Sequence, residues 1–379
     1  MKSNNELKLS NKIILSLKQE YFKTSVIQNS SDYFPNFIEK ALKDYANSYR
    51  EHLLKEVDLS VPFTNGRKDV IISKIIDLCE SINKTIDLYY NGKFHEATSI
   101  FNESLERVFF NDIKMVKQIR KGKTFYRARK DEDVLFNKEN LFHVPFQFRH
   151  IVSTTRYSLI GFPALYIADT TYTCWEEFER YRLRDLWFSK IQNQEELSVI
   201  EINHFKEFFN EYYNNETNRN EDEQLAYILS YLVTFPLTLA CTVKVKNPKG
   251  NFKPEYIIPQ LLIQYISTKK DIDGIKFPST KVDYSKLRGL NSYNYVFPVK
   301  SNNESGFCDK LIEKFHISEP TSLELEEIIH NTSNVYLKSK SSVHPIGEIE
   351  LINGKKSLYR DTSFGKIEIS LKNRKVYKL

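Results

Sequence analysis

Apolar residues recur every three or four positions through most of the first 115 residues, and this spacing predicts a helical region. It favours helices over residues 37–57, 69–92 and 93–110. Asn91-Gly92 lies at the end of the second segment, and a glycine there is typical of the left-handed residue that ends a helix. We therefore expect residues 1–115 to form a helical N-terminal region.

From about residue 120 the spacing changes to short apolar runs between polar turns, which predict strands. The expected strands cover residues 122–130, 164–168, 196–205, 239–246, 274–279 and 293–299. Helical spacing returns at residues 222–235 and 255–267. Strands that alternate irregularly with helices favour the α+β class over a doubly wound sheet.

The last 60 residues begin with a capped helix at 318–329 and then favour strands. Asn353-Gly354 stands between EIELI and SLYR and predicts a hairpin turn. Two further strands are expected at residues 366–370 and 375–379. The pattern thus predicts three parts: a helical region at 1–115, a mixed β-sheet domain at 116–330, and a basic C-terminal β-hairpin extension at 331–379.

The charge of the chain is concentrated in this extension. Residues 354–379 hold six Lys and two Arg against one Asp and one Glu, an excess equal to the net charge of +6 for the whole chain. Such a tail could bind nucleic acid or form a solvated surface. The four cysteines are far apart, which favours reduced thiols in a cytoplasm. The longest apolar run, residues 231–243, is too short to cross a membrane and is expected to be buried.

Several common kinds of site are not indicated by the sequence. No two of the eleven glycines lie within six residues of each other, so a glycine-rich phosphate loop is not expected. The closest histidine pair, His143 and His150, has no cysteine or carboxylate at ligand spacing, and we expect no metal. There is no GxSxG motif for a serine nucleophile. Any bound nucleotide would have to be held by side chains.

One stretch does combine chemically useful residues. Arg156 is followed ten residues later by Tyr166, within the apolar run ALYIA, and eleven residues further on by Glu177. The helix that carries Glu177 is expected to begin at residues 169–171, which are good capping residues. Glu176 has a local partner in Arg180, four residues on, whereas Glu177 does not, although the two glutamates leave the working carboxylate ambiguous.

The segments FHVPF, TTRYS, GFPALYIADTTYTCWEE, DGIKFPS and NYVFPV resemble the RES domain family over roughly residues 120–325. That family is named for an Arg, a Glu and a Ser, and it is similar to the ADP-ribosyltransferase fold. The resemblance implies an NAD-binding catalytic domain with a mixed β-sheet core. It also implies cleavage of the nicotinamide–ribose bond of NAD, with phosphate or water as acceptor, by a bacterial toxin or defence effector.

The resemblance also implies the site residues. By motif, the catalytic positions are Arg156, Tyr166, Glu177 and Ser279, and the NAD-binding positions are Arg127, Arg156, Tyr157, Tyr166 and Ser279. A carboxylate can stabilise an oxocarbenium-like ribose, a tyrosine can pack against nicotinamide, and arginine forks suit pyrophosphate. No metal is implied. Inorganic phosphate is a candidate co-substrate beside NAD.

Other functions stay open from the sequence. The same site could transfer ADP-ribose to a protein or nucleic-acid acceptor. A protein that binds nucleic acid without catalysis would use the basic tail with Tyr359, Phe364 and Tyr377. Because unrestrained loss of NAD harms its host, an inhibitor or antitoxin protein is an expected partner of an NAD-degrading enzyme. The role of residues 1–115 and the presence of a homo-oligomer are undecided by the sequence.

Overall fold

The structure is a computed structural model of the 379-residue chain. It describes residues 9–17, 20, 22–29, 32–53, 68–109, 116–130, 137–214, 219–245, 250–329 and 347–379. The chain divides into two compact units. Unit 1 comprises Met1–Lys117 and Glu201–Tyr265, and unit 2 comprises Gln118–Ile200 and Ile266–Leu379.

This division differs from the three parts expected from the sequence. Residues 201–265 were expected inside a sheet domain at 116–330, but they group with the N-terminal helices. Residues 347–379 were expected as a separate extension, but they belong to the unit that holds the sheet. Long-range hydrogen bonds explain the first difference, because the Tyr45 hydroxyl donates to the Leu232 carbonyl (2.6 Å) and the Ser10 hydroxyl to Glu221 (2.9 Å).

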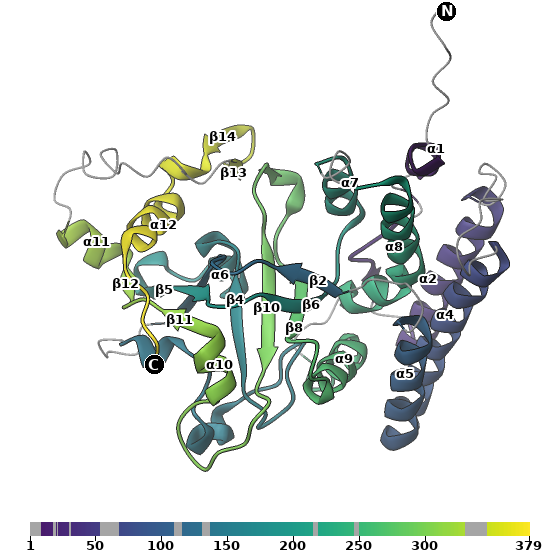
Figure 1. Cartoon of the computed structure of the whole chain (residues 1–379), viewed down its shortest axis with the longest axis horizontal. Coiled ribbons are helices and arrows are strands. Elements are labelled where there is room, and N and C mark those ends of the chain that lie inside the picture. The colour runs from purple at the N-terminus through teal and green to yellow at the C-terminus, as the bar shows by residue number, and fades with distance from the viewer. Residues whose placement is uncertain are drawn as a thin grey trace, which may run out of the picture. The chain divides into compact units, whose positions relative to one another are not determined.

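Unit 1 is mainly helical (Figure 1). Its helices are α1 (Leu9–Ser16), α2 (Phe34–Ser48) with a π-helical turn (Tyr49–Leu53), α4 (Lys68–Tyr90), α5 (Phe94–Phe109), α7 (Phe205–Asn214), α8 (Glu221–Thr242) and most of α9 (Ile257–Thr268). The short strands β1 (Ile27–Gln28) and β7 (Lys244–Val245) pair in parallel. The predicted helices at 37–57, 69–92 and 93–110 are confirmed as α2, α4 and α5 in the described residues, and α4 ends at Tyr90, two residues before Gly92, whose φ is +74°.

Helix α8 corrects one prediction. Residues 239–246 were expected to form a strand, but α8 continues through Pro236 to Thr242, and in the part of this stretch that the structure describes, up to residue 245, only Lys244–Val245 form a strand. A capping box between Asn220 and Glu223 fixes its start. By length and composition alone α8 could cross a membrane. This is weak evidence for a membrane span, because the core helices of soluble proteins pass the same test. In this protein 89% of the 18-residue apolar window of α8 is buried.

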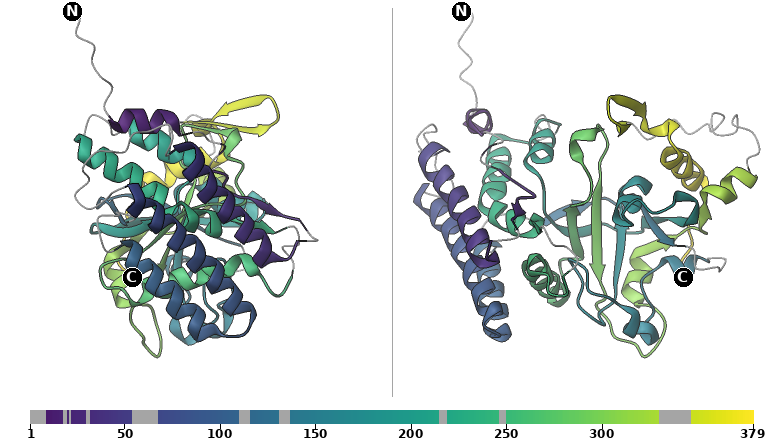
Figure 2. Two further views of the ribbon diagram at one scale, coloured as in Figure 1. Left: turned by 90° about the vertical axis from the view of Figure 1, so that its right-hand side faces the viewer. Right: turned by 180° about the vertical axis from the view of Figure 1, so that it is seen from behind.

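Unit 2 is built on a large β-sheet whose strands do not follow their order in the chain (Figure 2). This sheet with its covering helices confirms the α+β class. The strands follow the order β11-β5-β3-β4-β10-β8-β6-β2, and β12 also pairs with β5. Their bounds are β2 (Val116–Ile119), β3 (Thr124–Lys130), β4 (Ala164–Ala168), β5 (Leu186–Asn193), β6 (Leu197–Glu201), β8 (Gly274–Pro278), β10 (Tyr293–Pro298), β11 (Phe315–Ile317) and β12 (Thr321–Ser322). A second sheet joins β14 (Lys355–Leu358), β13 (Glu348–Ile352) and β9 (Leu287–Arg288).

Helices cover both faces of the large sheet. One face packs against α6 (Thr171–Glu177) and α12 (Ser363–Asn373), and the other packs against α10 (Asp309–Lys314). The remaining helix of the unit is α11 (Leu323–Ile329). Short 3₁₀ turns of the chain are η3 (Lys138–Leu141), η4 (Phe146–Ile151), η5 (Leu183–Asp185), η7 (Pro254–Tyr256), η8 (Tyr284–Lys286) and η9 (Tyr359–Asp361).

The C-terminal residues correct a second prediction. The hairpin at Asn353-Gly354 is confirmed between β13 and β14, but residues 366–370, expected as a strand, lie within α12. Thr362 caps this helix by accepting from the Gly365 amide. In the sequence KIEIS apolar and polar residues alternate, which predicts a strand in which Glu368 faces solvent. Glu368 is instead 4% exposed. With Glu368 on the buried side, the spacing of the buried residues is that of a helix.

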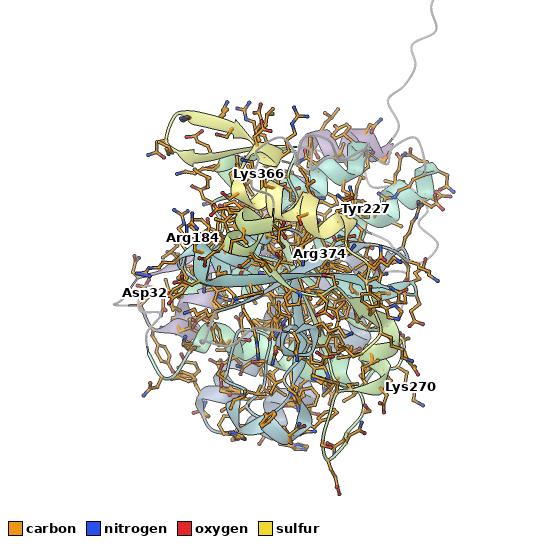
Figure 3. The ribbon with its side chains drawn as sticks, turned by 90° about the vertical axis from the view of Figure 1, so that its left-hand side faces the viewer. Asp32, Arg184, Tyr227, Lys270, Lys366 and Arg374 are labelled. Atoms are coloured by element: carbon orange, nitrogen blue, oxygen red, sulfur yellow. The ribbon has the colours of Figure 1, made fainter. Side chains whose placement is uncertain are left out.

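The basic tail is held mainly by structural contacts. Arg374, labelled in Figure 3, pairs with the buried Glu326 at 2.6 Å, and Lys190 donates to the Lys372 carbonyl at 3.0 Å. The Tyr359 ring is fully buried and Phe364 is 4% exposed. Two of the three rings that a nucleic-acid-binding tail would need are therefore inside the core.

The buried Glu368 carboxyl gives unit 2 a pH-dependent stability. Burial raises its pKa from 4.5 to about 7, with Asp169 adding to the effect and hydrogen bonds from Tyr359 and Thr171 opposing it. The folded protein keeps this proton to about pH 7, whereas the unfolded chain loses it near pH 4.5. The protein therefore loses stability as the pH rises between these values.

We predict that Glu368→Gln, which keeps the acceptor oxygen but cannot ionise, is more stable than wild type above pH 7 by up to about 3 kcal/mol. The difference should vanish below pH 4.5, because both side chains are then neutral. Urea unfolding at several pH values measures it. Glu313→Gln, at an exposed position on α10, is the control and should show no such trend. A gap between Glu368→Gln and wild type that is the same at every pH would contradict the prediction.

Candidate active site

Helix α6 carries the two glutamates and begins as the sequence predicts. Thr170 is its N-cap, and the Thr170 hydroxyl accepts from the Thr173 amide at 3.0 Å. Glu176 is 3% exposed, and the Arg180 guanidinium grips both of its carboxylate oxygens at 3.0 and 3.1 Å. The i,i+4 partnership expected from the sequence is confirmed. Because Arg180 occupies Glu176, Glu177 is the carboxylate available for other chemistry.

Glu177 is held by Ser279, directly after β8, by Asn294 on β10 and by Lys281. Its Oε1 accepts from the Ser279 hydroxyl and from the Asn294 amide, each at 2.6 Å. Its Oε2 lies 3.9 Å from the Lys281 ammonium, which also donates to the Glu177 carbonyl at 2.7 Å. The Glu177 side chain is 37% exposed. Oε1 is thus held by two short hydrogen bonds, whereas Oε2 has only the longer ion-pair contact with Lys281.

The backbone after α6 turns sharply. Glu179 and Arg180 have φ of +57° and +58°, a left-handed conformation that is uncommon for residues other than glycine. Lys281 also lies 3.5 Å from the Glu179 carboxylate. The turn lets Arg180 reach back to Glu176 and separates the surroundings of Glu176 from those of Glu177.

Arg127 lies where the sheet opens. Strand β3 pairs with β5 over its seven residues but meets β4 at a single register position, Tyr126 opposite Ala168. Beside this position, the Arg127 guanidinium donates to the Tyr166 carbonyl at 2.5 Å. Its Nε is buried and has no hydrogen-bond partner, and no carboxylate pairs with Arg127 among the residues that the structure describes.

The charge of Arg127 lowers the stability of the folded protein. Burial of the guanidinium, with a smaller contribution from the nearby Arg129, lowers the pKa of Arg127 from 12.5 to about 10. A partly buried cation without a counter-charge is unfavourable unless an anion completes the site. Arg127 is therefore suited to bind an anionic group of a ligand.

The loop that carries Arg156 is anchored on both sides of that residue. The Thr155 hydroxyl and the Tyr166 phenol share a hydrogen bond of 2.8 Å. Tyr157 is buried, and its ring packs on Phe277 with centroids 4.1 Å apart. These contacts hold the loop against β4, which supplies Tyr166, and against β8, which ends one residue before Ser279.

Two groups of predicted residues are thus brought together: Glu177 with Ser279, and Arg127 with Tyr166. Cys174, on the same helix as Glu177, donates to the carbonyl of Tyr126, the residue before Arg127, at 3.5 Å. Burial raises the pKa of the Cys174 thiol.

Asn294 and Lys281 were not predicted from the sequence. Asn294 is the polar residue inside the apolar strand YNYVFP, and it is 7% exposed. A polar side chain at the centre of a buried strand was the signal that could have identified it. Lys281 follows Ser279 by two residues and had no comparable signal. Among the described residues, no group of three or more His, Cys, Asp or Glu side chains could hold a metal ion.

Together these features define an α+β protein with a tethered carboxylate and a partly buried arginine on one unit. No family model matches the chain, and no solved structure matches it. The chain is 30% identical over 356 residues to the protein named "Putative toxin YopC" of Bacillus subtilis (strain 168). The match covers 88% of this chain and 77% of that relative. The chain therefore belongs to the same family as YopC.

The Arg127 site leads to a prediction about anions. Pyrophosphate or ADP should raise the melting temperature of the wild type by a few degrees, because a ligand at ten times its Kd stabilises by about 1.4 kcal/mol. Arg127→Met should abolish this shift, since it removes the buried cation. Thermal unfolding with and without each anion measures the effect.

The matched control is Arg184→Met, since the Arg184 side chain is 59% exposed and pairs with Glu327. This variant should keep the anion-induced shift. Equal shifts in wild type and Arg127→Met would show that the anion binds elsewhere.

Proposed function

We propose that the protein is a toxin that cleaves the nicotinamide–ribose bond of NAD. Its relationship to YopC, which is named as a toxin, supports the toxin role. The RES-like motifs support the reaction. The observation that carries the proposal is the Glu177 carboxylate, which is tethered through Oε1 by Ser279 and Asn294, while Oε2 has only a 3.9 Å contact with Lys281 and the side chain is 37% exposed.

This arrangement suits a reaction that builds positive charge on a sugar. When the bond between the ribose C1″ and the nicotinamide nitrogen breaks, its electron pair leaves with neutral nicotinamide. The ribose then has oxocarbenium character, which a fixed carboxylate stabilises. An oxygen of water or phosphate attacks C1″ and loses a proton. The tether matters because a preorganised charge does not have to reorganise during the reaction.

The other residues would hold the rest of the dinucleotide. Arg127 and Arg156 would bind the pyrophosphate, since guanidinium groups bind phosphate oxygens in pairs. Tyr166 would pack near the nicotinamide and its ribose. Tyr157, which the resemblance also implies as an NAD-binding residue, is 1% exposed and packs on Phe277, so it would support the Arg156 loop rather than contact the ligand. In this proposal unit 2 has the ADP-ribosyltransferase-like fold. The activity is cytoplasmic, because NAD is its substrate. An inhibitor or antitoxin protein restrains the activity.

The test compares the two adjacent glutamates. Purified wild type should release nicotinamide from NAD, and Glu177→Gln should reduce the rate at least a hundredfold, or about 3 kcal/mol of barrier. Glu176→Gln is the matched control, because Glu176 is occupied by Arg180, and its rate should stay within about threefold of wild type. Chromatography of nicotinamide and of the ribose product measures both.

Three outcomes bear on the proposal. Free ADP-ribose or its 1″-phosphate as product supports NAD degradation. Label that remains on a protein or nucleic acid would replace degradation with ADP-ribosyl transfer. No nicotinamide release by wild type, or equal release by Glu177→Gln, would refute the proposal.

A further inference from the structure

Helix α12, which lies outside the RES-like region, is bound to the start of α6. The Glu368 Oε1 accepts from three donors: the Thr171 amide at 2.7 Å, the Thr171 hydroxyl at 3.1 Å and the Tyr359 hydroxyl at 2.6 Å. Thr171 is the first residue of α6, and Glu177 is its last. Glu368 and Glu177 are therefore at opposite ends of the same short helix.

Helix α6 depends on such anchors. Its seven residues span about 10 Å, and helices of this length are not stable alone in water. Helix α12 also contacts α6 through Phe364, whose carbonyl lies 3.2 Å from the Thr171 hydroxyl and is the alternative acceptor for its single proton. The ring centroids of Phe364 and Trp175 are 5.2 Å apart. The position of α6 is set in large part by α12.

Helix α12 is itself fixed to the rest of unit 2. Lys190 on β5 donates to the carbonyls of Lys372 and Arg374 at its C-terminal end. Arg374 pairs with the buried Glu326 at 2.6 Å and donates to the Thr321 hydroxyl at 3.1 Å. A rigid connection thus runs from β5 through α12 to the first turn of α6.

We propose that Glu368 is a positioning residue that orients α6 and thereby places the Glu177 carboxylate for catalysis. This inference rests on the proposed function of Glu177. Three donors converge on one oxygen of Glu368, so the contact fixes the orientation of the first turn of α6 as well as its distance from α12. A buried carboxyl is a poor way to gain stability alone, because burying it costs desolvation energy that an apolar side chain of similar size would avoid.

The experiment uses two substitutions of Glu368 in the full chain. Glu368→Gln keeps an acceptor oxygen, whereas Glu368→Leu removes all three hydrogen bonds and keeps the approximate size. For nicotinamide release well below the melting temperature, we expect Glu368→Leu to lower kcat at least thirtyfold and to change the KM for NAD less than threefold. Glu368→Gln should stay within threefold of wild type in both. Glu313→Leu, at an exposed position, is the control.

A role through Glu177 also predicts non-additive effects. Adding Glu368→Leu to Glu177→Gln should lower the remaining rate less than threefold, because the group being positioned is already disabled. A full thirtyfold further loss would show that Glu368 acts independently of Glu177. An unchanged kcat in folded Glu368→Leu, or equal losses with Leu and Gln, would also overturn the inference.

Two further measurements keep the inference testable. If Glu368→Leu does not fold, Tyr359→Phe removes one donor and should lower kcat three- to tenfold; unchanged kcat would overturn the inference. If wild type releases no nicotinamide, the proposed function fails by itself. Amide hydrogen exchange over residues 171–177 then tests the positioning directly: exchange should be faster in Glu368→Leu than in Glu368→Gln, and equal exchange would overturn it.

Discussion

The register of β10 against its two neighbours is the constraint on which the candidate site depends. Asn294 lies opposite Ala168 of β4 and opposite Phe277 of β8. Residues that lie directly opposite in antiparallel strands share one face of the sheet, so Asn294 faces the side covered by α6. A shift of one residue would turn its amide to the other face and leave Glu177 without one of its two donors. The carboxylate is therefore positioned by strand pairing as well as by its own helix.

The elements that could be predicted from the sequence are those set by local signals. The helices α4 and α5 follow regular apolar spacing, and the start of α6 follows from its threonine cap. The partnership of Glu176 with Arg180 was also local in sequence, although Arg180 lies beyond the end of α6 and reaches Glu176 through a left-handed turn. Strand β4 and strand β10 were recognisable as apolar runs between polar turns. None of these signals requires knowledge of the distant parts of the chain.

The sequence was least informative where distant contacts decide the structure. Strand β5 was not predicted, although it pairs with β3 along the whole of that strand. Residues 366–370 were wrongly predicted as a strand, because their alternating pattern suggests an exposed Glu368. The burial of Glu368 depends on Thr171, almost two hundred residues away, which the local pattern does not contain. The role of Asn294 depends on Glu177, 117 residues earlier. The grouping of residues 201–265 with the N-terminal helices likewise follows from contacts that local patterns do not contain.

These long sequence separations have a kinetic consequence for the chain. Helices such as α4 close only local hydrogen bonds, whereas the tether of Glu177 joins residues 102 and 117 positions apart and the anchor of α6 joins residues 197 apart. Closing large loops is entropically costly and slows folding. The carboxylate should therefore acquire its partners late in folding, so that a half-folded molecule, although already rich in helix, does not yet contain the assembled candidate site.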